Sequence, residues 1–145
     1  RHFSKSGSYH TFRVNYKVLY STADLVSISF SGEAKFVDDA KVMKYAETLN
    51  YNIGAREFPK FNELFTSGYK ESLVKLFKKY YDRDVSVSDF GLATKFSFEP
   101  KYLIVSLPSI SEESYHAYKL PWSSIEKILA KGGVGDMVVK ANKRY

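Results

Sequence analysis

Apolar and polar side chains alternate along the whole of Leu25–Phe36, LVSISFSGEAKF. The alternate positions that start at Val26 are apolar or glycine, and those between them are serine, glutamate or lysine. A period of two places the two sets on opposite faces of a β-strand. Gly32 interrupts the apolar set and indicates a bulge or a close approach by another group. The stretch therefore predicts one long strand with an apolar face.

The segments on both sides of this strand show the same pattern. Phe12–Tyr20 places aromatic residues and valines on one face and predicts a half-buried strand. Tyr45–Ile53 predicts a third strand, after a turn at Asp38–Asp39. Because long uncovered strand edges promote aggregation, we expect other elements to cover at least one side of this sheet.

The second half of the chain adds helices and shorter strands. Apolar residues at helical spacing predict a helix over Tyr69–Tyr80, with lysines on its remaining surface. Thr94–Leu107 predicts two strands around a turn, the second apolar on both faces and therefore central. Ser114–Leu120 predicts a last strand. A second helix is expected from Ser123, with Glu126 completing a capping box.

This order, three strands, a helix, three strands and a helix, predicts an α+β fold. We expect an antiparallel β-sheet with two main helices packed mostly on one face. The expected organisation is a flexible N-terminal segment over residues 1–11, a single domain over 12–131 and a C-terminal tail over 132–145.

Composition restricts the chemistry. The 145 residues include no cysteine, which excludes disulfides, thiolate metal sites and a cysteine nucleophile. The formal net charge is +6, which favours anionic partners. No run of about 18 apolar residues, the length of a membrane span, is present. An anchoring segment before Arg1 remains an expectation.

The sequence suggests no catalytic residue, no cofactor and no metal site. The histidines, His2, His10 and His116, do not have the spacing of a metal site. On a strand, His116 and Tyr118 share one face, whereas Tyr115 points to the other. Packing between strands is the simpler interpretation of these aromatic residues. The alternative is a partner surface made by Tyr115, His116, Tyr118, Lys75, Lys78 and Lys79.

Four phrases together resemble a bacterial domain family of unknown function, DUF3298, with its associated deacetylase-N-terminal-like region. They are LVSISFSGEAKF (25–36), KYAETLNYNIGAREFPKFNELF (44–65), TKFSFEPKYLIVSLP (94–108) and KLPWSSIEKIL (119–129). Such domains occur in lysozyme-sensing anti-sigma factors and beside peptidoglycan deacetylase domains. The resemblance implies an extracytoplasmic, non-catalytic module, either secreted or anchored to the membrane or as a lipoprotein.

The partner that we expect is another envelope protein or a cell-wall polymer. Lysozyme is itself strongly basic and would be repelled by a domain of charge +6, so an anionic wall polymer fits better. One alternative is an accessory domain of a cell-wall polysaccharide deacetylase or another hydrolase. A second is nucleic-acid binding through Lys70, Lys75, Lys78 and Lys79, although a solvated helix face is the simpler interpretation of these lysines.

Overall fold

The computed structural model describes residues 9–36, 42–108 and 115–143. This part of the chain forms two antiparallel three-stranded sheets and three α-helices. The first sheet contains β1 (Tyr9–Ser21), β2 (Leu25–Phe36) and β3 (Val42–Asn52), and the second contains β4 (Lys95–Phe98), β5 (Tyr102–Pro108) and β6 (Tyr115–Pro121). The helices are α1 (Tyr69–Tyr81), α2 (Trp122–Ile125) and α3 (Val134–Lys143). The predicted α+β class with antiparallel strands is confirmed, but the strands divide into two sheets.

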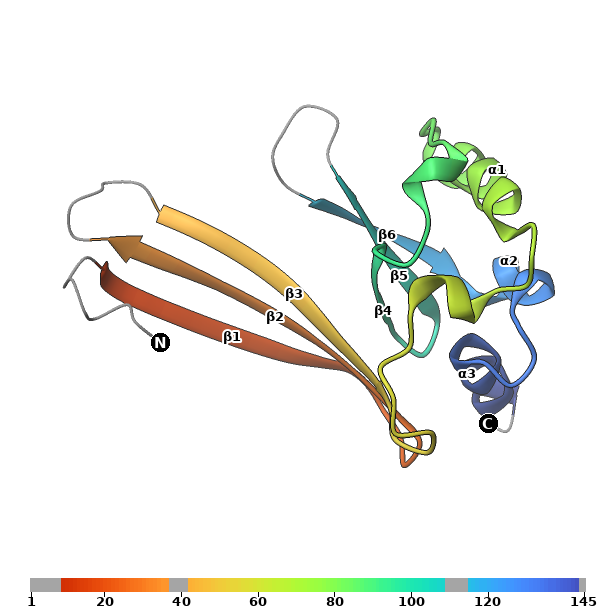
Figure 1. Cartoon of the computed structure of the whole chain (residues 1–145), viewed down its shortest axis with the longest axis horizontal. Helices are drawn as coiled ribbons and strands as arrows, with labels where there is room; N and C mark the ends of the chain where they lie inside the picture. Colours follow the sequence, from red (N-terminus) through yellow and green to blue (C-terminus); the bar gives the residue numbers. More distant parts are fainter. Residues whose placement is uncertain (1–8, 37–41, 109–114, 144–145) are drawn as a thin grey trace.

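The first sheet extends away from the helices as a curved arm, and the β5–β6 hairpin diverges from it (Figure 1). In the register of the arm, Tyr16 lies opposite Phe30, and Phe30 lies opposite Glu47. The alternating apolar residues therefore share one face, which we call the outer face. Its apolar residues are Phe12, Val14, Tyr16, Val18, Ile28, Phe30, Tyr45 and Leu49.

The predicted half-burial of the first strand is wrong for most of its length. The apolar residues of β1 from Phe12 to Val18 are exposed, and only Tyr20 at its end is buried. The reason is that the helices pack on the second sheet and leave the outer face of the arm uncovered (Figure 1). The long strands were correctly predicted, and part of their expected cover is present: β4 packs on the opposite, inner face at the base of the arm, whereas no described helix lies on the outer face.

Gly32 has the close approach that its position in the strand predicted. The Tyr45 ring lies over it, and a Cβ atom at Gly32 would be only 2.4 Å from Tyr45 Cζ and 2.6 Å from the Arg13 carbonyl oxygen. Tyr45 also stacks on Phe12, with ring centroids 6.1 Å apart. Glycine therefore lets an aromatic ring lie flat on the sheet.

The core lies between the second sheet and the helices. Leu103, Val105 and Leu107 of β5 are buried on the side of α1, and Ile104 is buried on the opposite side. This confirms the prediction of a central strand with both faces covered. Tyr20 and Leu25 join the same core from the base of the arm, where the Tyr20 ring meets Phe98 at 5.5 Å.

Helix α1 begins after Gly68, whose φ of 81° favours glycine. Leu73 and Phe77 are buried, as the helical spacing predicted. Tyr80 was expected on the same stripe but is exposed. No helix in the described part of the chain has the length and hydropathy needed to cross a membrane.

The end of the chain differs from the prediction of a tail over residues 132–145. Val134–Lys143 forms α3, because Val134 and Val138 are four residues apart and both are buried. At Gly135, a Cβ atom would lie 2.7 Å from the Leu129 side chain, so this glycine permits close packing of the helix. The domain therefore extends beyond residue 131.

The predicted capping box at Ser123 is also absent. Helix α2 starts one residue earlier, at Trp122, and continues as a 3-10 turn over Glu126–Ile128. Ser124 donates a hydrogen bond to the Pro121 carbonyl oxygen, and Glu126 forms an ion pair with Lys143. Glu126, which was expected to cap α2, therefore pairs with a lysine of α3 instead.

Candidate binding cleft between the two sheets

Three polar side chains of the arm join the two sheets at their base. Ser27 Oγ accepts a hydrogen bond from the Phe98 amide at 3.1 Å. Asn50 Nδ2 and Thr48 Oγ1 both donate to the Phe96 carbonyl oxygen, at 2.8 and 2.9 Å. β4 is an edge strand of the second sheet, and these bonds pair its Phe96 carbonyl and Phe98 amide with side chains of the arm.

Ser27 and Asn50 are themselves bonded to each other. Ser27 Oγ donates to Asn50 Oδ1 at 2.6 Å, and both residues are buried. Because unpaired buried polar groups are costly, this pair fixes the junction between the sheets. Beyond the junction the sheets separate.

The space between the separated sheets is a cleft of about 640 Å³. Its wall on the arm includes the small residues Ser29, Ser31 and Ala46, together with larger residues such as Lys44 and Tyr45. The opposite wall contributes Ile104, Ser106, Ala117 and the Tyr115 side chain from β5 and β6, with Lys95 of β4 nearby. Small side chains on both walls leave the space open, and serine hydroxyls give it hydrogen-bonding groups.

Tyr115 and Lys95 form the most distinctive pair of the cleft. Lys95 Nζ lies 4.7 Å from the centroid of the Tyr115 ring and 3.5 Å from Glu47 Oε2. The Tyr115 side chain is 54% exposed, so its ring is accessible. The Glu47 carboxylate is mostly in solvent, where an ion pair contributes little. Lys95 can therefore exchange this partner for an anionic ligand without a large loss.

The chemistry of these groups suits binding. Among the described residues that line the cleft, Glu47 is the one carboxylate, and the other ionisable groups are the ammonium groups of Lys44 and Lys95 and the hydroxyls of Tyr45 and Tyr115. Among the described residues, no three carboxylate or imidazole side chains are grouped so that they could hold a metal ion. An accessible ring, hydroxyls and ammonium groups together can contact a polar ligand that also has an apolar face.

The aromatic motif of β6 is divided between two faces, as the strand period predicted. Tyr115 lines the cleft, whereas Tyr118 packs on the helix side against Phe77 and Tyr81, with ring centroids 5.3 and 5.0 Å apart. Arg83 Nη1 donates to the Tyr118 hydroxyl. His116 is exposed beside Tyr118, with 6.5 Å between their ring centroids. Tyr118 is therefore a packing residue, and Tyr115 is available to a ligand.

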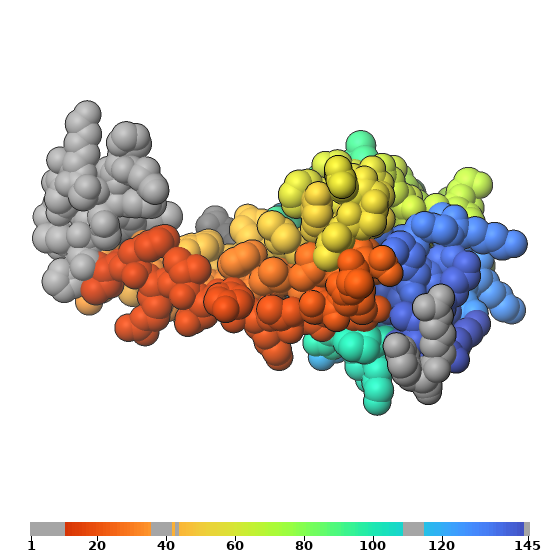
Figure 2. Space-filling view, turned by 90° about the horizontal axis from the view of Figure 1, so that it is seen from below, coloured from red at the N-terminus to blue at the C-terminus, as the bar shows by residue number. Residues whose placement is uncertain are grey.

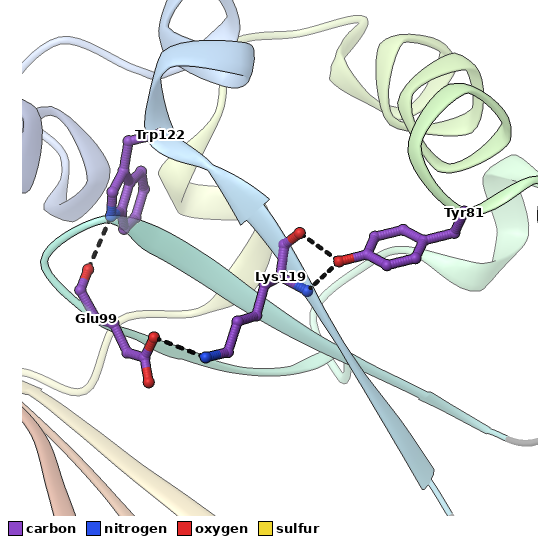
Figure 3. Close-up of polar contacts among 4 residues, drawn as sticks. All are labelled: Tyr81, Glu99, Lys119 and Trp122. Atoms are coloured by element: carbon purple, nitrogen blue, oxygen red, sulfur yellow. Dashed lines mark hydrogen bonds and ion pairs between the residues drawn. The ribbon is translucent and has the colours of Figure 1, made fainter.

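At the edge of β6, the Tyr81 side chain of α1 forms hydrogen bonds to the Lys119 backbone (Figure 3). The Tyr81 hydroxyl donates to the Lys119 carbonyl oxygen at 2.6 Å and accepts from its amide at 2.9 Å. Lys119 Nζ lies 3.2 Å from Glu99 Oε1, and Trp122 Nε1 donates to the Glu99 carbonyl oxygen at 2.9 Å. This network fixes the corner where β6 passes into α2.

The helix lysines do not join the cleft. Lys75, Lys78 and Lys79 are exposed on α1, which packs on the other face of the second sheet. Lys78 is held by Asp82 at 2.9 Å and by Asp84 at 3.4 Å. Hydrogen bonds to Asp82 and then Asp84 raise the pKa of Lys78, and the bond to Lys78 lowers the pKa of Asp82. The six residues expected as one partner surface thus lie in separate places.

Of the residues that line the cleft, Tyr115 is the one that the sequence predicted as part of a partner surface. Ser29 and Ser31 belong to the polar set of the alternating strand, to which no role was assigned from the sequence. Lys95 and Ser106 face each other across the β4–β5 pair. The available signal was the unusual run of serines on a long strand, since serine is small and leaves room for a ligand.

Comparison with known proteins gives structural matches only. No protein-family model matches the chain, and no curated protein sequence matches it. A DUF3298 family member from Bacteroides fragilis (BF2082) superimposes with a TM-score of 0.65 at 14% identity, covering 92% of this chain and 58% of that one. A DUF3298 family protein from Pseudomonas aeruginosa (PA4972) has a TM-score of 0.55 at 15% identity, with 83% and 62% covered.

The chain therefore spans about three fifths of the length of these two proteins. At such low identity the likeness concerns the three-dimensional arrangement. The resemblance inferred from the four sequence phrases is confirmed at that level: this chain has the fold of a DUF3298-type domain.

Proposed function

We propose that this chain is a non-catalytic binding module whose ligand site is the cleft between the two sheets. The observation that carries the proposal is the accessible Tyr115 ring beside Lys95, at the mouth of a cleft lined by serine hydroxyls. Rings of this kind contact the apolar faces of sugars, hydroxyls can bond to sugar hydroxyls, and lysines attract carboxylates. The ligand class that this set of groups fits best is an anionic glycan.

The charge of the molecule supports the same ligand. The formal net charge is +6, and two lysines, Lys44 and Lys95, line the cleft against one carboxylate, Glu47. Such a surface raises the association rate of a polyanion. Combined with the DUF3298-type fold, this favours an extracytoplasmic role on a bacterial cell-wall polymer.

Titration with soluble peptidoglycan fragments that retain their carboxylates tests this function. We expect saturable binding that weakens as salt is raised, and weaker binding of a neutral chito-oligosaccharide of the same length. Tyr115→Ala should raise the dissociation constant about tenfold or more, because it removes the aromatic contact. Ser106→Phe should reduce binding further by filling the cleft.

The chain contains a matched control for the pair in the cleft. On α1, Lys79 Nζ lies 5.6 Å from the Tyr80 ring centroid, which reproduces the lysine–tyrosine pair far from the cleft. Tyr80→Ala should leave binding unchanged. Equal losses in Tyr115→Ala and Tyr80→Ala, or no binding at low salt, would contradict the proposal.

A further inference from the structure

The outer face of the arm is an apolar surface that no described helix covers. Tyr16 is 71% exposed, Val14 and Val18 are each 49% exposed, and Tyr45 is 38% exposed. The register places one charged residue, Glu47, on this face, but it belongs to the edge strand β3 and its carboxylate reaches Lys95 of the cleft. Figure 2 shows β1 at the surface of the molecule, with no helix lying on it in that view. Contiguous apolar surface of this kind marks an interaction site in soluble proteins.

The size of this surface matches one half of a dimer interface. With aromatic side chains of about 150–250 Å² each, the exposed parts of the outer face amount to roughly 500 Å². A standard interface buries about 800 Å² per partner, and homodimer interfaces are about 65% apolar. Roughly 500 Å² of apolar surface is therefore what one subunit of a standard dimer contributes.

The shape of the outer face is suited to packing against its own copy. Tyr16 is more exposed than Tyr45, whose ring lies over Gly32, which is opposite Val14 and has no side chain. A two-fold axis would place the exposed Tyr16 of each copy against Val14 and the Tyr45 ring of the other, so both contacts form at once.

The distribution of charge favours stacking of the outer faces of two copies over hydrogen-bonded pairing of their β1 edges. Arg13 and Lys17 are on the opposite, inner face of β1, together with Lys44 of β3. If two β1 edges paired, the basic residues of both copies would come close together, which is unfavourable. If the outer faces stack, the same residues point away from the interface.

From these observations we infer that two copies of this chain associate outer face to outer face, as two stacked sheets. The interface uses Tyr16, Val14 and Val18 at its centre. It leaves the clefts on the two inner faces open, so the inference does not depend on the function proposed for the cleft. A dimer of this kind would present two clefts to one polymer and bind it with avidity.

Sedimentation velocity and light scattering on the full chain test this association. We expect a monomer–dimer equilibrium for the wild-type chain that tightens as salt is raised, because salt screens the repulsion between two copies of charge +6. Tyr16→Lys should weaken the association about 100-fold or more, since it would bury an unpaired charge. Val14→Lys should have a similar effect.

Tyr80→Lys is the matched control, because it places the same charge on an exposed tyrosine of α1. It should leave the dimer intact. A wild-type chain that stays monomeric at high micromolar concentration would overturn the inference. So would a monomer that binds phosphatidylglycerol-containing vesicles through Tyr16, since the face would then contact lipid. Thermal unfolding of every variant confirms that the chain remains folded.

Discussion

Both sheets of this molecule have strands with an apolar face, but the two differ in what covers that face. β1 and β2 alternate apolar and polar residues, and β5 is apolar on both faces. The apolar residues of β5 are buried, whereas those of β1 from Phe12 to Val18 are exposed. The difference is that β5 lies beneath α1, whereas no described element of the chain lies on the outer face of the arm. Alternation therefore specifies which side chains share a face, and the rest of the fold decides whether that face is covered.

Removal of one aromatic side chain from each region gives the largest expected contrast. Phe77→Ala should lower the free energy of unfolding by about 3–5 kcal/mol, because Phe77 has no exposed surface and contacts Phe90, Tyr81 and Tyr118. Tyr16→Ala on the arm should change it by less than about 0.5 kcal/mol in the monomer. Urea unfolding followed by Trp122 fluorescence measures both. A loss of several kcal/mol in Tyr16→Ala would show that the outer face is covered within one chain.

The second prediction concerns the hydrogen bonds of Ser27 and Asn50, which hold the two sheets together at the base of the arm. Asn50→Ala should cost about 2–3 kcal/mol, because it leaves the buried Ser27 hydroxyl and the Phe96 carbonyl oxygen with fewer partners. Thr48→Val removes the second bond to the same carbonyl at a more exposed position and should cost less. Hydrogen exchange should show a loss of amide protection in β4, at Phe98 in particular. Unchanged protection there would contradict the role of the junction.

Sequence alone predicted the elements better than their contacts. The strand around Gly32, the α1 helix and the central position of β5 follow from local periodicity, and the structure contains them. The division into two sheets could not be predicted, because it depends on bonds from Ser27 and Asn50 to β4, tens of residues away in the chain. The helix at Val134–Lys143 was missed because it follows two glycines and becomes basic toward its end, which is typical of a tail.

The candidate site shows the same limit. Tyr115 could be identified because aromatic residues on an exposed strand stand out in a sequence. Lys95, Ser31 and Ser106 could not be joined to it, since they come from three other strands and meet only when the sheets diverge. A cleft between two sheets is a property of their relative orientation, which no local pattern encodes.

The smallest expected effect concerns α3, which helps to close the core on the helix side. Asp136 accepts a hydrogen bond from the Gly132 amide at 2.9 Å and lies 3.0 Å from Lys140 Nζ. The Gly132 amide and then Lys140 lower the pKa of the Asp136 carboxyl below its ordinary value of 3.8. A lowered pKa means that the charged form stabilises the folded state above the unfolded pKa. This contribution is lost as the pH falls through the folded pKa.

Asp136→Asn should therefore lower the free energy of unfolding by at most about 1 kcal/mol near neutral pH, where the carboxylate is charged. The difference from the wild-type chain should shrink below about pH 4 and vanish once the carboxyl is protonated in both states. Asp82→Asn is the matched control, because Asp82 pairs with Lys78 across one helical turn but is fully exposed. If Asp82→Asn and Asp136→Asn change the free energy of unfolding equally, the Gly132 amide bond to Asp136 contributes nothing to stability. A larger effect at Asp136 would show that the start of α3 is held by a specific bond, in contrast with the uncovered face of the arm.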